Sequence, residues 1–150
     1  AKQNPDRQVV FFGLGFETTM PSTALTLQQA KKDGVRNFFL FCNHITIIPT
    51  IKAILDSPDM TIDGFLGPGH VSMVIGQQPY EFIARHYQRP LVIAGFEPLD
   101  VLQSLYMLLQ QIAEGRADIE NQYKRLVPDG GNHQALKAVA DVFELREFFE

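Results

Sequence analysis

The stretch Val9-Val10-Phe11-Phe12-Gly13-Leu14-Gly15-Phe16-Glu17-Thr18-Thr19 begins as an unbroken apolar run and ends in a polar turn. An apolar run such as Val9 to Leu14 is typical of a strand that is buried on both faces of a parallel sheet. Gly15 ends the run, and Thr18 or Thr19 can cap the helix that follows. The stretch therefore predicts a strand, a loop and a helix in direct succession.

The same order recurs three more times along the chain. Further apolar runs, each followed by a loop and a helical pattern, occupy residues 37–42, 62–66 and 91–94. Strands that alternate with helices form parallel sheets through right-handed crossovers. We therefore expect an α/β domain over residues 1–115, with a four-stranded parallel sheet and helices on both faces, a Rossmann-like three-layer sandwich. Residues 116–150 are expected to form a C-terminal helical extension that leads towards the rest of a longer protein.

The composition excludes several classes of protein. The 150 residues are 45% hydrophobic and 20% charged, which is a globular balance. The net charge of −4 argues against a nucleic-acid surface, which needs clustered Lys and Arg. We find no apolar stretch near the ~20 residues of a membrane helix and no signal-peptide core. Cys42 is the single cysteine, which fits a reducing compartment, so we expect a cytoplasmic protein that binds neither nucleic acid nor membrane.

Three loops combine glycine with polar side chains, and each follows an apolar run. They span residues 15–19, 67–72 and 95–100. In a parallel sheet, all strand-to-helix loops emerge at one edge, where ligand sites form. The sequence therefore predicts one composite polar site at that edge, built from residues that are far apart in the chain.

Ionisable groups in these loops are the candidate catalytic residues. His70 lies in a glycine-rich turn, where an imidazole can shuttle a proton, bind an anion or ligate a metal, or can simply order the turn. Glu17 and Glu97 each follow Gly-Phe, and such a carboxylate can carry a proton or can favour a helix N-terminus. We assign catalytic roles to His70 and Glu97. The other residues expected to line the site are Glu17, Thr18, Thr19, His44, Gly69, Ser72 and Asp100.

His44 lies two residues after Cys42, so their side chains share one face of an extended strand. This pair is not a metal site by itself, and a buried cysteine at the strand end is the simpler interpretation. We therefore expect no metal ligands in this chain.

The loop motifs together resemble those of the HypD family of hydrogenase maturation factors. The matching segments are residues 15–21, 43–44, 68–72 with Gly76, 94–100, 121–125 and 131–132. The resemblance implies an iron–sulfur protein that works with HypC and HypE to assemble the Fe(CN)2CO group of [NiFe]-hydrogenases. It also implies two similar α/β lobes that face a cleft, plus a lobe that binds a [4Fe-4S] cluster, with this chain as the middle lobe. By motif matching, Glu17, Thr18, His70, Ser72 and Glu97 would face the cleft.

Several family motifs are absent from the sequence. These are Cys-Gly-Thr-His, which the resemblance implies would hold iron, the thiol pair of Gly-Pro-Gly-Cys-Pro-Val-Cys, and the cysteines of the cluster. We therefore expect this segment alone to carry neither cluster nor iron and not to be catalytic. Whether the whole scaffold is an enzyme stays open.

Two other classes of function remain as alternatives. One is a small-molecule enzyme that uses His70 and Glu97 as acid and base. The other is a nucleotide-binding module built on Gly13 and Gly15, although Thr18 replaces the third glycine of the dinucleotide motif. The sequence favours the scaffold, because several motifs match in order and no complete catalytic set is visible.

Overall fold

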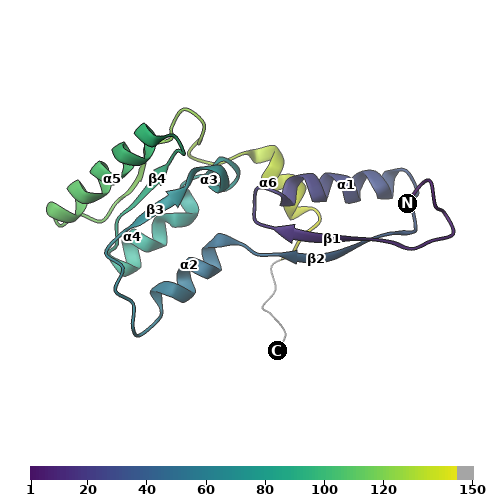
Figure 1. The fold of residues 1–150 in the computed structure, drawn as a ribbon, viewed down its shortest axis with the longest axis horizontal. Coiled ribbons are helices and arrows are strands. Elements are labelled where there is room, and N and C mark those ends of the chain that lie inside the picture. Colours follow the sequence, from purple (N-terminus) through teal and green to yellow (C-terminus); the bar gives the residue numbers. More distant parts are fainter. Residues whose placement is uncertain (145–150) are drawn as a thin grey trace. The chain divides into compact units, whose positions relative to one another are not determined.

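The computed structural model describes residues 1–144, which form two compact units. The first unit contains residues 1–45 and the described residues from 134 onward, and the second contains residues 46–133. Figure 1 shows that each unit combines strands and helices. Among the described residues, no helix has both the length and the apolar character that crossing a membrane requires.

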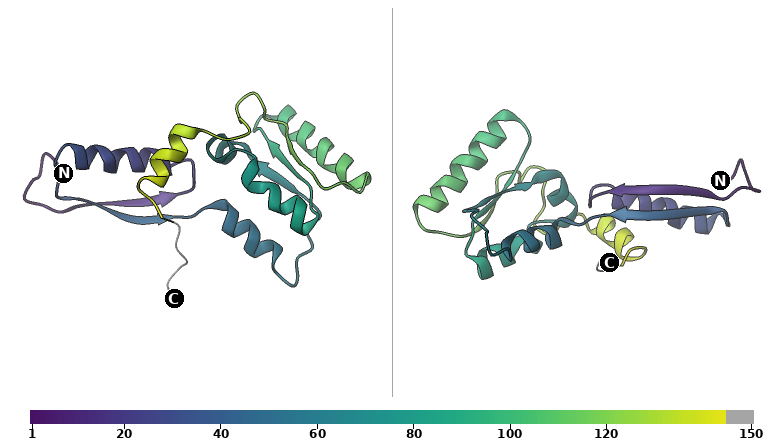
Figure 2. Two further views of the ribbon diagram at one scale, coloured as in Figure 1. Left: turned by 180° about the vertical axis from the view of Figure 1, so that it is seen from behind. Right: turned by 60° about the horizontal axis from the view of Figure 1, so that its bottom comes forward.

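The first unit is built on two parallel strands. β1 (Val9–Gly15) and β2 (Phe38–His44) pair in register, with Val9 opposite Phe38 and Gly15 opposite His44. The connecting helix α1 (Met20–Lys32) lies along the pair (Figures 1 and 2). The last described helix, α6 (His133–Ala140), belongs largely to this unit and lies within the C-terminal extension expected over residues 116–150.

The second unit is built on three parallel strands in the order β3-β4-β5. The strands are β3 (Phe65–Pro68), β4 (Leu91–Ala94) and β5 (Ile119–Asn121). The helices are α2 (Ile47–Leu55), α3 (Gly69–Ile75), α4 (Glu81–Tyr87) and α5 (Pro98–Ala113), with a 3₁₀ turn over Gln78–Tyr80.

The β4 strand is the centre of this second unit. Leu91 and Ile93 pack in one apolar cluster with side chains of α2 and α4. Val92, between them, points to the opposite face of the sheet. Figures 1 and 2 show α4 and α5 on opposite sides of β3 and β4. Leu91, Val92 and Ile93 are all fully buried, so the unit is a three-layer α/β/α arrangement.

The prediction of one four-stranded parallel sheet is wrong. The strands are parallel, but they form a two-stranded and a three-stranded sheet. The reason lies at β4, which has two edges: β3 pairs with one and β5 with the other. The β5 strand has three residues, including Glu120 and Asn121, so it shows no apolar run and was missed.

The expectation that the first strand is buried on both faces is also wrong for this structure. Val10, Phe12 and Phe41 are 61%, 53% and 60% exposed. Two strands and one covering helix leave much of their apolar surface open, whereas β4 has neighbours on both edges and both faces. The end of the expected C-terminal extension, residues 145–150, lies outside the described residues.

Candidate functional site

The loops that follow β3, β4 and β5 meet at the carboxyl edge of the three-stranded sheet. After β3, Gly69 and His70 begin α3, and after β4, Phe96 and Glu97 lead into α5. Parallel strands bring such loops to a single edge. The residues that meet there are called the edge site: His70, Phe96, Glu97, Asp100, Tyr123 and Arg125.

Three aromatic rings form a column in the edge site. The His70 imidazole stacks on Phe96, with ring centroids 3.9 Å apart and planes 26° apart. Phe96 also contacts Tyr123 edge-on, at 6.5 Å between ring centroids. Tyr123 is 7% exposed and belongs to the apolar core, whereas His70 is exposed. The exposed His70 imidazole is therefore connected to the apolar core through the ring contacts of Phe96 and Tyr123.

A paired arginine and aspartate lie beside this column. Arg125 Nη1 and Nη2 donate to Asp100 Oδ1 and Oδ2 at 2.8 and 2.6 Å, and the guanidinium lies 4.5 Å from the Tyr123 ring centroid. The Arg125 guanidinium, helped by the Gln122 amide, lowers the pKa of Asp100 to about 2. Glu97 lies 3.9 Å from Arg125 and is exposed. The site thus has a buried aspartate that is ionised at neutral pH. It also has an exposed carboxylate, Glu97, which follows in sequence the Phe96 ring that stacks on His70.

Two glycines allow the loops to close around Tyr123. A methyl group added at Gly69 or Gly95 would come within 2.8 or 2.7 Å of the Tyr123 ring. Gly95 N also donates to Gln122 Oε1 at 3.2 Å, which ties its loop to the segment after β5. Glycine is needed at both positions because backbone and ring approach too closely for any side chain.

Ser72, which we expected to line the site, lies within α3 and is fully buried. Its hydroxyl donates to the Pro68 carbonyl at 2.8 Å and lies 3.2 Å from the Tyr80 hydroxyl. These contacts hold the first turn of α3, which carries His70. A direct contact between Ser72 and a ligand stays a prediction.

The remaining predicted residues lie at the carboxyl edge of the β1–β2 pair in the first unit. Thr19 is the N-cap of α1, but its hydroxyl donates to the Phe16 carbonyl and makes no capping bond. Glu17 is buried and Thr18 is exposed. His44 lies opposite Gly15, with Nδ1 3.6 Å from Cys42 Sγ, and burial lowers the pKa of its imidazole.

The predicted site residues therefore fall into two groups, one in each unit. The second unit brings together His70, Glu97 and Asp100, whereas Glu17 and His44 belong to the first unit. That the two groups form one composite site stays a prediction. The sequence did not single out Phe96, Gln122, Tyr123 or Arg125 as site residues. Phe96 lies in the predicted loop 95–100, and the other three lie in the motif over residues 121–125, so these two segments held the signal that could have found them.

The chain does not fit a resident [4Fe-4S] cluster. Such a cluster is held by four cysteine thiolates, and the sequence has one cysteine. Within residues 1–144, no group of three or more His, Cys, Asp or Glu side chains could hold a metal ion.

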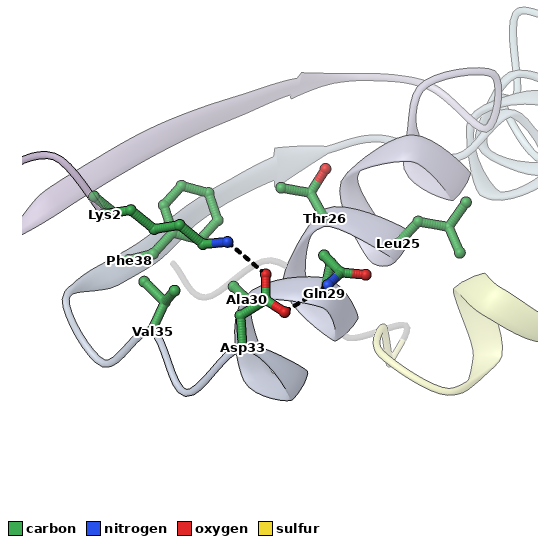
Figure 3. A pocket seen from close by; sticks show the side chains of 9 residues that line it. Lys2, Leu25, Thr26, Gln29, Ala30, Asp33, Val35 and Phe38 are labelled. Carbon is green, nitrogen blue, oxygen red and sulfur yellow. Dashed lines mark hydrogen bonds and ion pairs between the residues drawn. The ribbon is translucent and has the colours of Figure 1, made fainter.

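A separate hollow of about 550 Å³ lies in the first unit, beside α1 (Figure 3). Lys2 Nζ pairs with Asp33 Oδ2 at 2.6 Å across it, and Gln29 donates to the same carboxylate at 2.7 Å. Leu25, Phe38 and other largely apolar neighbours form the rest of its wall. None of the predicted site residues lines this hollow.

Fold and edge site together define an α/β protein with a polar site on the carboxyl edge of a parallel sheet. The family model HypD, described as "Hydrogenase formation hypA family", matches residues 1–149. The chain therefore belongs to the HypD family. It is 63% identical over 150 residues to the hydrogenase maturation factor HypD of Rhodobacter capsulatus and 62% identical over 143 residues to that of Escherichia coli K12. It is 53% identical over 156 residues to that of Rhizobium leguminosarum.

The chain spans about two fifths of the length of these relatives. All of it aligns with the Rhodobacter and Rhizobium proteins, and 95% of it with the Escherichia protein. The aligned regions cover 40%, 40% and 38% of those three proteins.

Proposed function

We propose that this chain is one part of a cytoplasmic scaffold protein for [NiFe]-hydrogenase maturation. On this scaffold, HypC-like and HypE-like partners would assemble the Fe(CN)2CO group. Membership of the HypD family and relatives that are named hydrogenase maturation factors support the proposal. Since the chain spans two fifths of those relatives, the proposal concerns the full-length protein.

The observation that carries the proposal is the exposed His70 imidazole, which stacks on Phe96 at the carboxyl edge of the three-stranded sheet. An imidazole can donate a hydrogen bond or move a proton near neutral pH. The exposed Glu97 carboxylate can accept or return that proton. We assign His70 to a proton or hydrogen bond at an iron-bound ligand, and Glu97 to proton exchange at the same edge.

The Fe(CN)2CO group needs iron ligands that this segment does not supply. Iron that carries cyanide and carbon monoxide suits soft thiolate ligands. Cys42 is the single thiol here, so further thiolates must come from other segments or partners. The residues of this chain would then contribute hydrogen bonds and proton transfer around an iron group that is held elsewhere.

Replacing His70 in the full-length protein tests this proposal. We expect His70→Ala to abolish hydrogenase maturation and to leave the thermal midpoint unchanged, because the imidazole is exposed. His86→Ala is the matched control, since His86 is an exposed histidine on α4 of the same unit. A folded His70→Ala protein that matures hydrogenase at the wild-type rate would refute the proposal.

A further inference from the structure

We propose that the Asp100–Arg125 pair positions the His70 imidazole by way of Tyr123 and Phe96. The inference rests on the proposed function for the task of His70 and adds the residues that hold it in place. Arg125 and Asp100 touch neither the imidazole nor, on this view, the substrate, so they are positioning residues.

The first step is the set of hydrogen bonds that joins the loop after β4 to the segment after β5. Arg125 donates both terminal nitrogens to the Asp100 carboxylate. Gln122 Nε2 donates to Asp100 Oδ1 at 3.0 Å, and Gly95 N donates to Gln122 Oε1 at 3.2 Å. The loop that carries Phe96 is therefore held on both sides, at Gly95 and at Asp100.

The second step is the placement of the Phe96 ring, which is itself 55% exposed. Phe96 lies between Tyr123, which is buried, and His70, which is exposed. The Arg125 guanidinium covers the Tyr123 ring at 4.5 Å from its centroid. The Arg125 guanidinium thus contacts the Tyr123 ring, against which Phe96 packs, and it also bonds Asp100, which lies next to the loop that carries Phe96.

The third step is the dependence of His70 on Phe96. Among residues 1–144, stacking on Phe96 is the interaction that the structure records for the His70 imidazole. No described side chain donates to or accepts from its ring nitrogens, which stay available for chemistry. The orientation of the imidazole therefore follows the position of Phe96.

A merely structural ion pair would behave differently. An exposed pair contributes little to stability, but the side chain of Asp100 is 8% exposed and its contact with Arg125 is bidentate. If the pair only stabilised the fold, folded variants would leave the imidazole environment unchanged. If it positions His70, the imidazole environment must change even in variants that stay folded.

The test uses nuclear magnetic resonance of the full-length protein labelled with ¹³C-histidine. The His70 signal is identified by its loss in His70→Gln, and Phe96→Leu gives its position without stacking. We expect Arg125→Gln and Asp100→Asn to move the His70 ring-proton signals downfield, towards the Phe96→Leu position, because the shielding by the Phe96 ring is lost. Unchanged His70 signals in folded Arg125→Gln and Asp100→Asn proteins would overturn the proposal.

Arg116→Gln is the matched control. Arg116 also bonds several carboxylates, those of Glu114, Asp118 and Glu120, but it lies at the other end of α5. The helix has 16 residues, which is about 24 Å of length. We expect Arg116→Gln to leave the His70 signals in place, and an equal shift in this control would refute a specific role for Arg125. If both Arg125→Gln and Asp100→Asn fail to fold, the pair is a folding element and the proposal is wrong.

Maturation assays separate this inference from the proposed function. A misplaced catalytic group can lose about 100-fold in rate, so we expect Arg125→Gln to slow maturation about tenfold or more. Arg125→Lys keeps the charge but loses the bidentate contact of the guanidinium, so its maturation rate should fall between those of the wild-type protein and Arg125→Gln. If His70→Ala is inactive and an unstacked Arg125→Gln protein matures hydrogenase normally, the positioning role fails and the proposed function stands. If His70→Ala matures hydrogenase normally, the proposed function fails, and the His70 signals still decide whether the pair holds the imidazole.

Discussion

Replacing Gly95 by alanine tests the packing of the edge site most sharply. A methyl group there would lie 2.7 Å from Tyr123 Cδ2 and would collide with the Asp100 carboxylate. Non-bonded carbons rest about 3.5–4.0 Å apart, so the overlap with Tyr123 is about 1 Å. Neither neighbour can withdraw, because Tyr123 is buried in the core and Arg125 holds Asp100. Overpacking of this kind costs about 1–3 kcal/mol.

Hydrogen exchange of the β4 backbone amides measures this cost in the second unit alone. These amides belong to the buried central strand, so their slow exchange reports the opening of that unit. We expect Gly95→Ala to lower the free energy of opening by about 1–3 kcal/mol, which is an exchange rate about 5–150 times higher.

Gly130→Ala is the control for the glycine change itself. A methyl group at Gly130 would come no closer than 3.5 Å to His133, an ordinary contact. We expect this variant to change the free energy of opening by less than about 0.5 kcal/mol. If Gly95→Ala costs no more than Gly130→Ala, the close packing of the loop around Tyr123 is refuted.

Three further predictions concern pH, a buried hydroxyl and the cluster. The pKa of Asp100 is held at about 2, below its ordinary 3.8, so its stabilisation is full above about pH 4 and is lost as the pH falls towards 2; acid titration by circular dichroism should show a smaller loss in Asp100→Asn, and an equal loss would contradict the ion pair. Ser72→Ala should lower the free energy of unfolding by about 1 kcal/mol in urea titrations, because the half-buried Pro68 carbonyl loses the hydroxyl of Ser72 as a donor; no change would show that the bond contributes nothing. Anaerobic reconstitution of the 150-residue chain should give no stoichiometric [4Fe-4S] cluster, because Cys42 cannot replace four thiolates, and matching iron and sulfide contents would overturn this.

The apolar runs located most of the regular structure. The run at residues 91–94 is β4 with the same bounds, and the helical pattern that follows it is α5. The partition of strands into sheets was not predictable in this way, because pairing depends on which edges are free. β5 occupies the second edge of β4 with Ile119, Glu120 and Asn121, a segment too short and polar to be recognised.

The part of the site that was predictable from the sequence consists of ionisable residues that directly follow strands of one parallel sheet. His70 and Glu97 both follow strands of one parallel sheet, so the sequence correctly predicted that their loops share an edge. The links between them were not visible, because the Arg125–Asp100 bond joins residues 25 positions apart and depends on β5. The stacking of His70 on Phe96 likewise depends on how closely the two loops approach, which the Gly69 and Gly95 positions allow.

Infrared spectroscopy of the full-length protein, purified with its HypC-like partner, tests the assignment of His70 most directly. Cyanide and carbon monoxide bound to iron absorb in a window where protein groups do not. We predict these bands in the wild-type complex and in His86→Ala, and their loss in a His70→Ala protein of unchanged thermal midpoint. Bands of wild-type position and intensity in folded His70→Ala would contradict the role of His70 in assembling the iron group.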